Sequence, residues 1–219
     1  MTPSPVRETE VRIASDGSFV EGNLSIPEGS RAIVVFAHGS GSGRFSPRNM
    51  QVARKINYAG MATLLMDLLT AEEEEIDMVT AEFRFDIDLL AKRLVDATEW
   101  VKKNPATKNM AVGYFGASTG AAAALIAAAQ LPKYVKAVVS RGGRPDLAAE
   151  HLPLVEAPTL LIVGGNDPEV LEMNEEALKR ISVEKKLEIV PGATHLFEEP
   201  GKLEAVARLS INWFQNHLV

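Results

Sequence analysis

Short apolar runs with strand-like composition alternate along this chain with longer segments of helical character. Runs that are apolar throughout are typical of strands covered on both faces, as in a parallel sheet. The runs occupy residues 33–37, 62–66, 110–115, 135–139, 160–163 and 187–190. The helical segments occupy residues 48–60, 82–103, 118–131, 171–181 and 202–218. This alternation predicts an α/β fold, with helices on both faces of a doubly wound, mostly parallel sheet.

The beginning of the chain follows a different pattern. Two strand-like runs, Val6–Ile13 and Phe19–Ile26, flank the dipeptide Asp16-Gly17, which is a strong turn signal. This arrangement predicts an antiparallel hairpin at one edge of the sheet.

No repeat or long linker divides the chain. We therefore expect a single domain over residues 1–219, with an edge hairpin in residues 1–30 and a catalytic core in residues 31–219. The acidic run Glu72–Glu75 is interpreted as a solvated helix start or loop.

Charge and composition exclude several classes of function. The chain has a net charge of −6 at pH 7, so it lacks the basic field that attracts nucleic acid. It has no cysteine, which excludes disulfides, thiolate metal sites and a cysteine nucleophile. We expect neither a metal nor an organic cofactor. The absence of a signal-like start and of a long apolar run predicts a cytoplasmic protein that does not bind membranes. An exposed edge strand or the last helix would allow a homodimer.

The segment Gly116-Ala117-Ser118-Thr119-Gly120 is the clearest chemical signal in the sequence. It follows a predicted strand and opens a predicted helix, which is where a sharp turn projects a nucleophilic serine above the sheet. The N–H of Thr119 would then lie at a helix N-terminus, where it can face a developing negative charge. The alternative is an ordinary glycine-rich turn, because the G-x-S-x-G pattern also recurs by chance.

A serine nucleophile needs a base and an acid that orients the base. His195 follows the last predicted strand, so it should lie at the carboxyl edge of the sheet, where ligands bind in such folds. Asp167 follows the preceding strand, and Pro168 disfavours helical geometry at that aspartate. Asp146, one strand earlier, is the alternative acid. A solvated surface histidine and a helix-capping aspartate remain the simpler interpretations of these positions.

The glycine-rich run His38-Gly39-Ser40-Gly41-Ser42-Gly43 follows the first central strand. Its glycines would let the backbone curl toward Ser118 and present the N–H of Ser40 as a second oxyanion donor. The run matches neither the P-loop pattern nor the dinucleotide-binding pattern. We expect His38 to shape this loop rather than to transfer protons.

These residues resemble the α/β-hydrolase superfamily, and within it the dienelactone hydrolase-like branch. The resemblance covers about residues 18–219 and rests on the motifs at 38–43, 116–120, 165–167 and 192–195. It implies a mostly parallel sheet of about eight strands. The segment 141–158, where many enzymes of this fold insert a lid, is too short for a lid domain.

The resemblance also implies roles for individual residues: Ser118 as nucleophile, His195 as base, Asp167 as orienting acid, and Thr119 and Ser40 as backbone oxyanion donors. Dienelactone hydrolases use a cysteine nucleophile, whereas this chain has a serine. The expected substrate is therefore a small carboxylic ester, lactone or thioester rather than dienelactone itself.

Four arginines follow predicted strands or lie in the rim loops: Arg44, Arg48, Arg141 and Arg144. A forked guanidinium can bind a substrate carboxylate, and we assign this role to Arg141 and Arg48. The alternative is that these arginines form ion pairs with acids such as Asp146 or Glu150.

The sequence thus predicts a serine hydrolase that forms an acyl-enzyme at Ser118 and acts on small substrates, including anionic ones. A non-catalytic binding or scaffold protein of the same fold is the alternative, because a fold does not determine a function. Transfer of the acyl group to an acceptor other than water would use the same residues.

Overall fold

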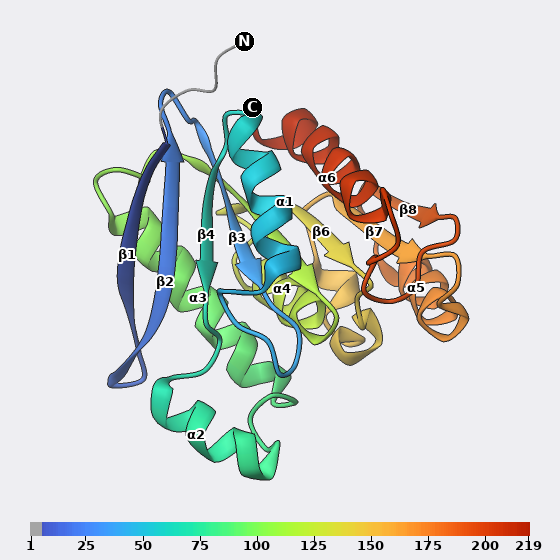
Figure 1. The fold of residues 1–219 in the computed structure, drawn as a ribbon, viewed down its shortest axis with the longest axis horizontal. Coiled ribbons are helices and arrows are strands. Elements are labelled where there is room, and N and C mark those ends of the chain that lie inside the picture. The colour runs from blue at the N-terminus through green and yellow to red at the C-terminus, as the bar shows by residue number, and fades with distance from the viewer. Residues whose placement is uncertain (1–5) are drawn as a thin grey trace.

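The computed structural model describes residues 6–219, and its centre is an eight-stranded sheet with the order β1-β2-β4-β3-β5-β6-β7-β8 (Figure 1). The strands are β1 (Val6–Ser15), β2 (Ser18–Pro27), β3 (Ala32–Ala37), β4 (Ala62–Met66), β5 (Ala111–Ala117), β6 (Val135–Arg141), β7 (Thr159–Gly164) and β8 (Lys185–Val190). Strands β3 to β8 run parallel to one another, and the hairpin of β1 and β2 joins antiparallel to β4. The predicted α/β fold with an antiparallel edge hairpin is confirmed.

Six α-helices lie in the described part of the chain. They are α1 (Pro47–Tyr58), α2 (Ala71–Thr80), α3 (Ile87–Lys103), α4 (Thr119–Gln130), α5 (Pro168–Arg180) and α6 (Lys202–Leu218). Helices α1 and α6 cover one face of the sheet and share one apolar core with it. Helices α3, α4 and α5 cover the other face. None of the described helices is both long and apolar enough to cross a membrane.

Strand β3 shows why the predicted strands are apolar at every position and do not alternate between apolar and polar residues. Its residues Ile33 and Val35 belong to the core on the α3 and α4 side, whereas Val34 and Phe36 belong to the core on the α1 and α6 side. All four side chains are buried, because successive side chains point to opposite faces of a sheet that is covered on both. Burial on both faces therefore explains the runs from which the parallel sheet was predicted.

The hairpin turn has the backbone geometry that its sequence predicts. Strands β1 and β2 pair over their whole length, from Val6 with Pro27 to Ser15 with Ser18. The two turn residues between them, Asp16 and Gly17, both have positive φ angles, of 48° and 80°. Such turns match the twist of the flanking strands, and glycine adopts the second of these angles without steric cost.

The helix predicted over 82–103 is present as α3 but begins at Ile87, where the Asp86 side chain caps it. A separate helix, α2, precedes it and ends at Ala81 in a left-handed conformation. Helix α2 begins with a capping box between Thr70 and Glu73, so the acidic run is the first turn of a helix. The helix lies below the carboxyl ends of β3 and β4 (Figure 1).

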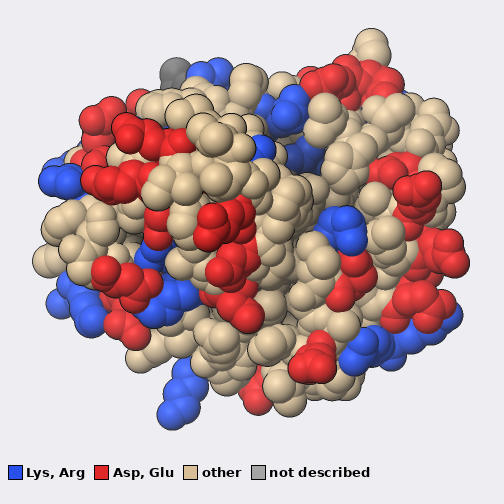
Figure 2. Space-filling model, turned by 90° about the horizontal axis from the view of Figure 1, so that it is seen from below, with Lys and Arg blue, Asp and Glu red and all other residues tan. Residues whose placement is uncertain are grey.

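The segment after β6 contains two short 3-10 helices, η1 (Pro145–Ala148) and η2 (Leu152–Leu154), and no inserted lid. The carboxyl ends of the parallel strands are therefore covered only by loops and by α2. Figure 2 shows the molecule from this side, and acidic and basic side chains are interspersed on it without a continuous basic patch.

Candidate active site

Ser118 lies in a sharp turn between β5 and α4. Its φ of 51° is rare for a residue with a side chain, and its ψ is −122°. The flanking glycines make this turn possible. A Cβ atom at Gly116 would lie 2.4 Å from Cα of Ala121, and one at Gly120 would lie 2.4 Å from the carbonyl oxygen of His38. The turn thus needs both glycines of the motif, as expected for a strained nucleophile elbow.

The structure brings the side chains of Ser118, His195 and Asp167 together, although they come from loops after three different strands. The Nδ1 atom of His195 lies 2.7 Å from Oδ2 of Asp167, and its Nε2 atom lies 3.4 Å from Oγ of Ser118. A carboxylate accepts only, so His195 donates its Nδ1 proton to Asp167 and keeps Nε2 free to accept a proton. The Ser118–His195 distance is long for a hydrogen bond.

The loops that carry Asp167 and His195 are joined by their backbones. The N–H of Asn166 donates to the carbonyl of Ala193 at 2.9 Å. A Cβ atom at Gly164 would lie 2.4 Å from that same carbonyl oxygen, so only glycine allows this approach. Glycine after a strand is a sequence signal for such close contact, but the sequence alone does not show which loop it contacts.

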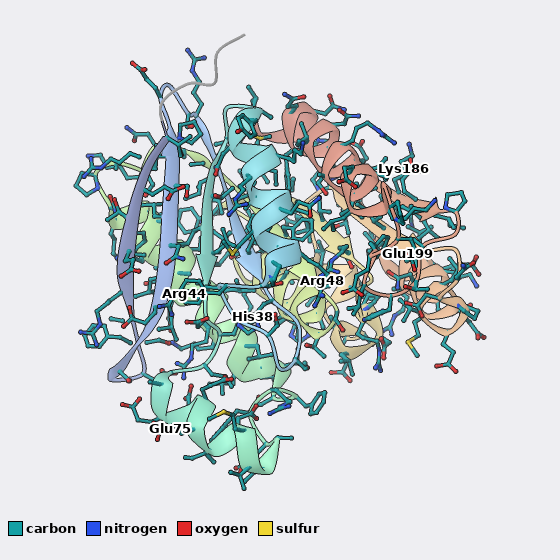
Figure 3. The ribbon with its side chains drawn as sticks, in the orientation of Figure 1. His38, Arg44, Arg48, Glu75, Lys186 and Glu199 are labelled. Carbon is teal, nitrogen blue, oxygen red and sulfur yellow. The ribbon has the colours of Figure 1, made fainter. Side chains whose placement is uncertain are left out.

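Two further residues hold the His195 loop in place. The Oε1 atom of Glu199 (Figure 3) accepts hydrogen bonds from both the backbone N–H and the hydroxyl of Thr194, at 3.1 and 2.6 Å. The hydroxyl bond from Thr194 is the main reason that the pKa of Glu199 lies below its ordinary value. On the opposite side, Gly142 has a φ of 51° and approaches the His195 ring. Sequence reasoning missed both Glu199 and Gly142.

The alternative acid, Asp146, does not lie at His195. Both of its carboxylate oxygens bind Arg144, at 2.9 and 2.7 Å. Asp146 belongs to the short helix η1 and is two residues from Arg144 along the chain, so the pair forms locally. Asp167 is therefore the acid that contacts His195.

The glycine-rich loop after β3 packs directly on Ser118. A Cβ atom at Gly39 would lie 3.1 Å from Cβ of Ser118. The Ser40 N–H donates to Oγ1 of Thr119 at 3.0 Å, so both predicted oxyanion donors lie next to Ser118 but one of them already has an acceptor. The N–H of Thr119 belongs to the first turn of α4, where N–H groups have no acceptor within the helix. The oxyanion role of both groups stays a prediction.

His38 (Figure 3) is buried at the start of this loop. Its Nε2 atom accepts a hydrogen bond from the Leu68 N–H at 3.0 Å, so its proton is on Nδ1, which donates to the Gly39 carbonyl at 3.0 Å. Burial lowers the pKa of His38, which favours the neutral ring. His38 links the ends of β3 and β4 and has no contact with Ser118 or His195 among the hydrogen bonds of the described residues.

A cavity of about 190 Å³ opens at Ser118 and His195. It is lined by the loop after β3, the start of α1, Arg141 and Leu196. Larger hollows exist, up to about 560 Å³, but they are not lined by Ser118 or His195. The cavity at Ser118 is small for a ligand pocket. No cluster of acidic or histidine side chains with the spacing of a metal site occurs in residues 6–219.

Three of the four predicted rim arginines form ion pairs. Arg44 pairs with Asp67, Arg48 pairs with Glu198 at 2.7 Å, and Arg144 pairs with Asp146. Arg44 and Arg48 lie near the carboxyl ends of the central strands (Figure 3). For these three residues the structure therefore contains the ion pairs that were the alternative to substrate binding. Of the partners, Asp146 was predicted, whereas Asp67 and Glu198 were not.

Arg141 differs from the other three arginines. Its side chain is only 6% exposed and lines the cavity at Ser118, yet it forms no ion pair or hydrogen bond within residues 6–219. Its guanidinium lies 6.0 Å from the centre of the Phe197 ring. Burial, and to a smaller degree the nearby charge of Arg48, lowers the pKa of Arg141 to about 10. At neutral pH the cavity therefore contains a buried positive charge without a protein anion.

Comparison with known proteins places these features in a family. Residues 20–216 match the model of the dienelactone hydrolase family. The crystal structure of a dienelactone hydrolase from Anabaena variabilis is 58% identical, covers 98% of this chain and 99% of that chain, and superimposes with a TM-score of 0.96. Est1E from Butyrivibrio proteoclasticus is 16% identical, covers 94% of this chain and 99% of that chain, and has a TM-score of 0.77, which shows a shared fold.

The curated relatives have a name that differs from that of the matched family. Proteins from Mycobacterium tuberculosis named "Putative phosphoribosyl transferase" are 56% identical to this chain over 214 residues. The match covers 98% of this chain but only 47% of those proteins, so the chain spans about half the length of the curated relatives.

Proposed function

Because the chain belongs to the dienelactone hydrolase family, we propose that it is a serine-dependent hydrolase of carboxylic esters, lactones or thioesters. The observation that carries the proposal is the connected set of Ser118, His195 and Asp167, with contacts of 3.4 and 2.7 Å. Serine becomes a nucleophile when a neutral imidazole accepts its proton, and the imidazole needs an acceptor on its other nitrogen. The arrangement supports both conditions.

The reaction would proceed in two steps. The Oγ atom of Ser118 attacks the substrate carbonyl while Nε2 of His195 takes the hydroxyl proton, and Asp167 stabilises the resulting imidazolium. His195 then gives this proton to the departing alcohol or thiol, which leaves an acyl-enzyme. Water attacks the acyl group with His195 again as base, and the acid is released. The N–H groups of Thr119 and Ser40 would stabilise the oxyanion in both steps.

Arg141 supports a preference for substrates with a negative charge. A buried cation without an anion is costly, and a bound carboxylate would remove that cost through charge-assisted hydrogen bonds. Arg48 lines the same cavity, but Glu198 already neutralises it, so one unbalanced positive charge remains. The cavity volume of about 190 Å³ favours a short acyl chain at Ser118. Est1E, which has the same fold, has been crystallised with ferulic acid, a small carboxylic acid.

The name of the curated relatives describes proteins of which this chain covers only 47%, so it does not assign a transferase activity to this half. The glycine-rich run at residues 38–43 matches neither common phosphate-loop pattern. A non-catalytic role of the fold remains the second hypothesis, and the length of the Ser118–His195 contact, 3.4 Å, is the observation in its favour.

Hydrolysis of short p-nitrophenyl esters tests the proposal. We expect activity in the wild-type chain and its loss, by at least about a thousandfold, in Ser118→Ala, because the acyl-enzyme can no longer form. Ser182→Ala removes a hydroxyl from an exposed position far from the cavity and serves as the matched control. Activity that survives Ser118→Ala would remove Ser118 from the mechanism.

A further inference from the structure

The contact between Ser40 and Thr119 joins the two residues whose N–H groups are assigned to the oxyanion hole. The Ser40 N–H donates to Oγ1 of Thr119 at 3.0 Å, and the two hydroxyl oxygens lie 2.9 Å apart. The Ser40 hydroxyl also reaches the carbonyl oxygen of Arg84 at 3.2 Å. Thr119 is only 4% exposed, so its hydroxyl has little access to solvent.

Counting protons assigns a direction to each of these bonds. The Arg84 carbonyl can only accept, so the Ser40 hydroxyl donates its single proton there. The proton between the two hydroxyls therefore belongs to Thr119, which donates to Ser40 and accepts from the Ser40 N–H. Every donor among these hydrogen bonds therefore has an acceptor. The bonds between Ser40 and Thr119 join the loop after β3 to the first residue of α4.

The turn that supplies the Arg84 carbonyl is held by a buried carboxylate, that of Asp77. Oδ1 of Asp77 accepts the N–H groups of Phe83 and Arg84 at 2.8 and 2.9 Å, and its Oδ2 accepts from Nε of Arg84 at 2.6 Å. Asp77 is 1% exposed. The Arg84 carbonyl that receives the Ser40 hydroxyl is thus part of a rigid turn.

The loop that contains Ser40, by contrast, is rich in glycine. Ser40 is flanked by Gly39 and Gly41, and Gly41 has a φ of 67°. The turn over residues 39–42 is closed by one backbone bond, from the Ser42 N–H to the Gly39 carbonyl at 3.2 Å. Because glycine permits many backbone conformations, the Thr119 hydroxyl adds a second restraint on the direction of the Ser40 N–H. In oxyanion stabilisation, a donor is effective only when its direction is fixed before the charge develops.

We propose that Thr119 is a positioning residue, whose side-chain hydroxyl holds the Ser40 N–H beside the N–H of Thr119 so that both can face one oxyanion. The inference rests on the proposed function, because it requires an oxyanion at Ser118. During attack, the Ser40 N–H is shared between Oγ1 of Thr119 and the developing negative oxygen, as in a three-centre hydrogen bond. The hydroxyl acts through Ser40 and forms no bond to the substrate.

The isosteric variant Thr119→Val tests this role, since it removes the acceptor and keeps the shape. We expect kcat for p-nitrophenyl acetate to fall by roughly tenfold to a hundredfold, with KM changed by less than about twofold, because only the transition state is affected. A boronic acid that forms a tetrahedral adduct with Ser118 should lose affinity by a similar factor. Thr119→Ser, which restores the hydroxyl, should recover most of the rate.

Two controls separate positioning from damage to the fold. Thr9→Val makes the same change at an exposed position of β1, where the threonine hydroxyl has no hydrogen bond among the described residues, and should leave all three constants unchanged. Ser40→Ala keeps the backbone N–H and removes only the hydroxyl that accepts from Thr119. If the Ser40 hydroxyl matters only because it orients the Thr119 hydroxyl, the double variant Ser40→Ala, Thr119→Val should be no slower than Thr119→Val alone.

Several results would overturn the inference. A Thr119→Val variant as fast as the wild type, or faster, would mean that the hydroxyl merely competes with the oxyanion for the Ser40 N–H. A slower variant with unchanged boronic acid affinity would mean that the hydroxyl acts outside the oxyanion hole. If instead the wild-type chain reacts with no fluorophosphonate, the proposed function itself fails, so the two failures are distinguishable.

Discussion

Arg141 brings a positive charge to the cavity at Ser118 without a carboxylate partner within residues 6–219. The other three rim arginines each have such a partner. A buried unpaired ion costs several kcal/mol, so its retention is most simply explained by an anion that arrives with the substrate. The sequence assigned substrate binding to both Arg141 and Arg48 and could not separate the two, because ion-pair partners such as Glu198 depend on tertiary contacts.

Replacing Arg141 should change the selectivity between anionic and neutral esters. Charge-assisted hydrogen bonds contribute about 1.5–3 kcal/mol, so Arg141→Ala should lower kcat/KM for a half-ester of a short dicarboxylic acid by roughly tenfold to a hundredfold. For a neutral ester of the same length, the change should stay within a few-fold. Arg144→Ala, which removes an arginine already paired with Asp146, is the matched control. Equal losses for both esters would contradict the assignment.

The same preference should depend on pH in a defined direction. The pKa of Arg141 is lowered to about 10, so its guanidinium loses its charge as the pH rises through that value. The ratio of kcat/KM for the anionic ester to that for the neutral ester should therefore fall between about pH 9 and pH 11. In Arg141→Ala the ratio should stay flat over this range.

At the scale of secondary-structure elements, the site depends on how closely α4 approaches the end of β3. A Cβ atom at Gly120 would meet the carbonyl oxygens of His38 and Ala37 at 2.4 and 2.5 Å. Both are backbone atoms, so they cannot move aside as a side chain would. The close approach also brings Thr119 within reach of Ser40.

Gly120→Ala should therefore be strongly destabilising. We expect the free energy of unfolding in urea to fall by about 3 kcal/mol or more, because overpacking against backbone forces α4 away from β3. Gly22→Ala is a useful comparison, since its Cβ would meet Cδ1 of Leu64 at 3.1 Å, the end of a side chain that can move. A Gly120→Ala variant as stable as Gly22→Ala would contradict the tight contact between α4 and β3.

The elements themselves were largely predictable, for a physical reason. Strands covered on both faces must be apolar throughout, so their positions follow from the sequence directly. The end of α2 and the first residue of α3 were not predictable in this way. They depend on a left-handed residue at Ala81 and on the Asp86 cap, neither of which disturbs the hydrophobic pattern.

At the scale of the whole molecule, Arg93 connects parts of the chain that are far apart in sequence. It is 1% exposed, and it donates to Ser15 and Asp16 at the hairpin turn and to Glu73 in α2, at 2.5, 2.8 and 2.6 Å. Arg93 belongs to α3, so the edge hairpin, the helix below the site and the helix behind the sheet meet at one cation.

Removing Arg93 and removing its two acidic partners should lower the free energy of unfolding by different amounts. Arg93→Met removes the buried charge itself and leaves acids that can reach water, so unfolding free energy should fall by only about 1–3 kcal/mol. The double variant Asp16→Asn, Glu73→Gln leaves the buried cation without an anion, and we expect a loss of about 3–5 kcal/mol. Asn tolerates the positive φ of the turn and Gln keeps the capping box, so local effects are small. Urea unfolding measures both, and a larger loss in Arg93→Met would contradict this order.

The three candidate catalytic side chains could be predicted because each follows a strand, and the carboxyl ends of parallel strands meet at one edge of the sheet. Contacts between loops could not be predicted in the same way. The bond of Ser40 to Thr119 and the pairing of Arg48 with Glu198 join residues that no periodic pattern relates.

The central claim is that Ser118 is an activated nucleophile, and covalent labelling tests it most directly. The measurement is the mass of the intact chain after reaction with a fluorophosphonate, followed by peptide mapping of the modified residue. The account predicts one adduct per chain at Ser118, none in Ser118→Ala, and much slower labelling in His195→Ala. A folded chain that stays unlabelled, or one that is modified at another residue, would contradict it.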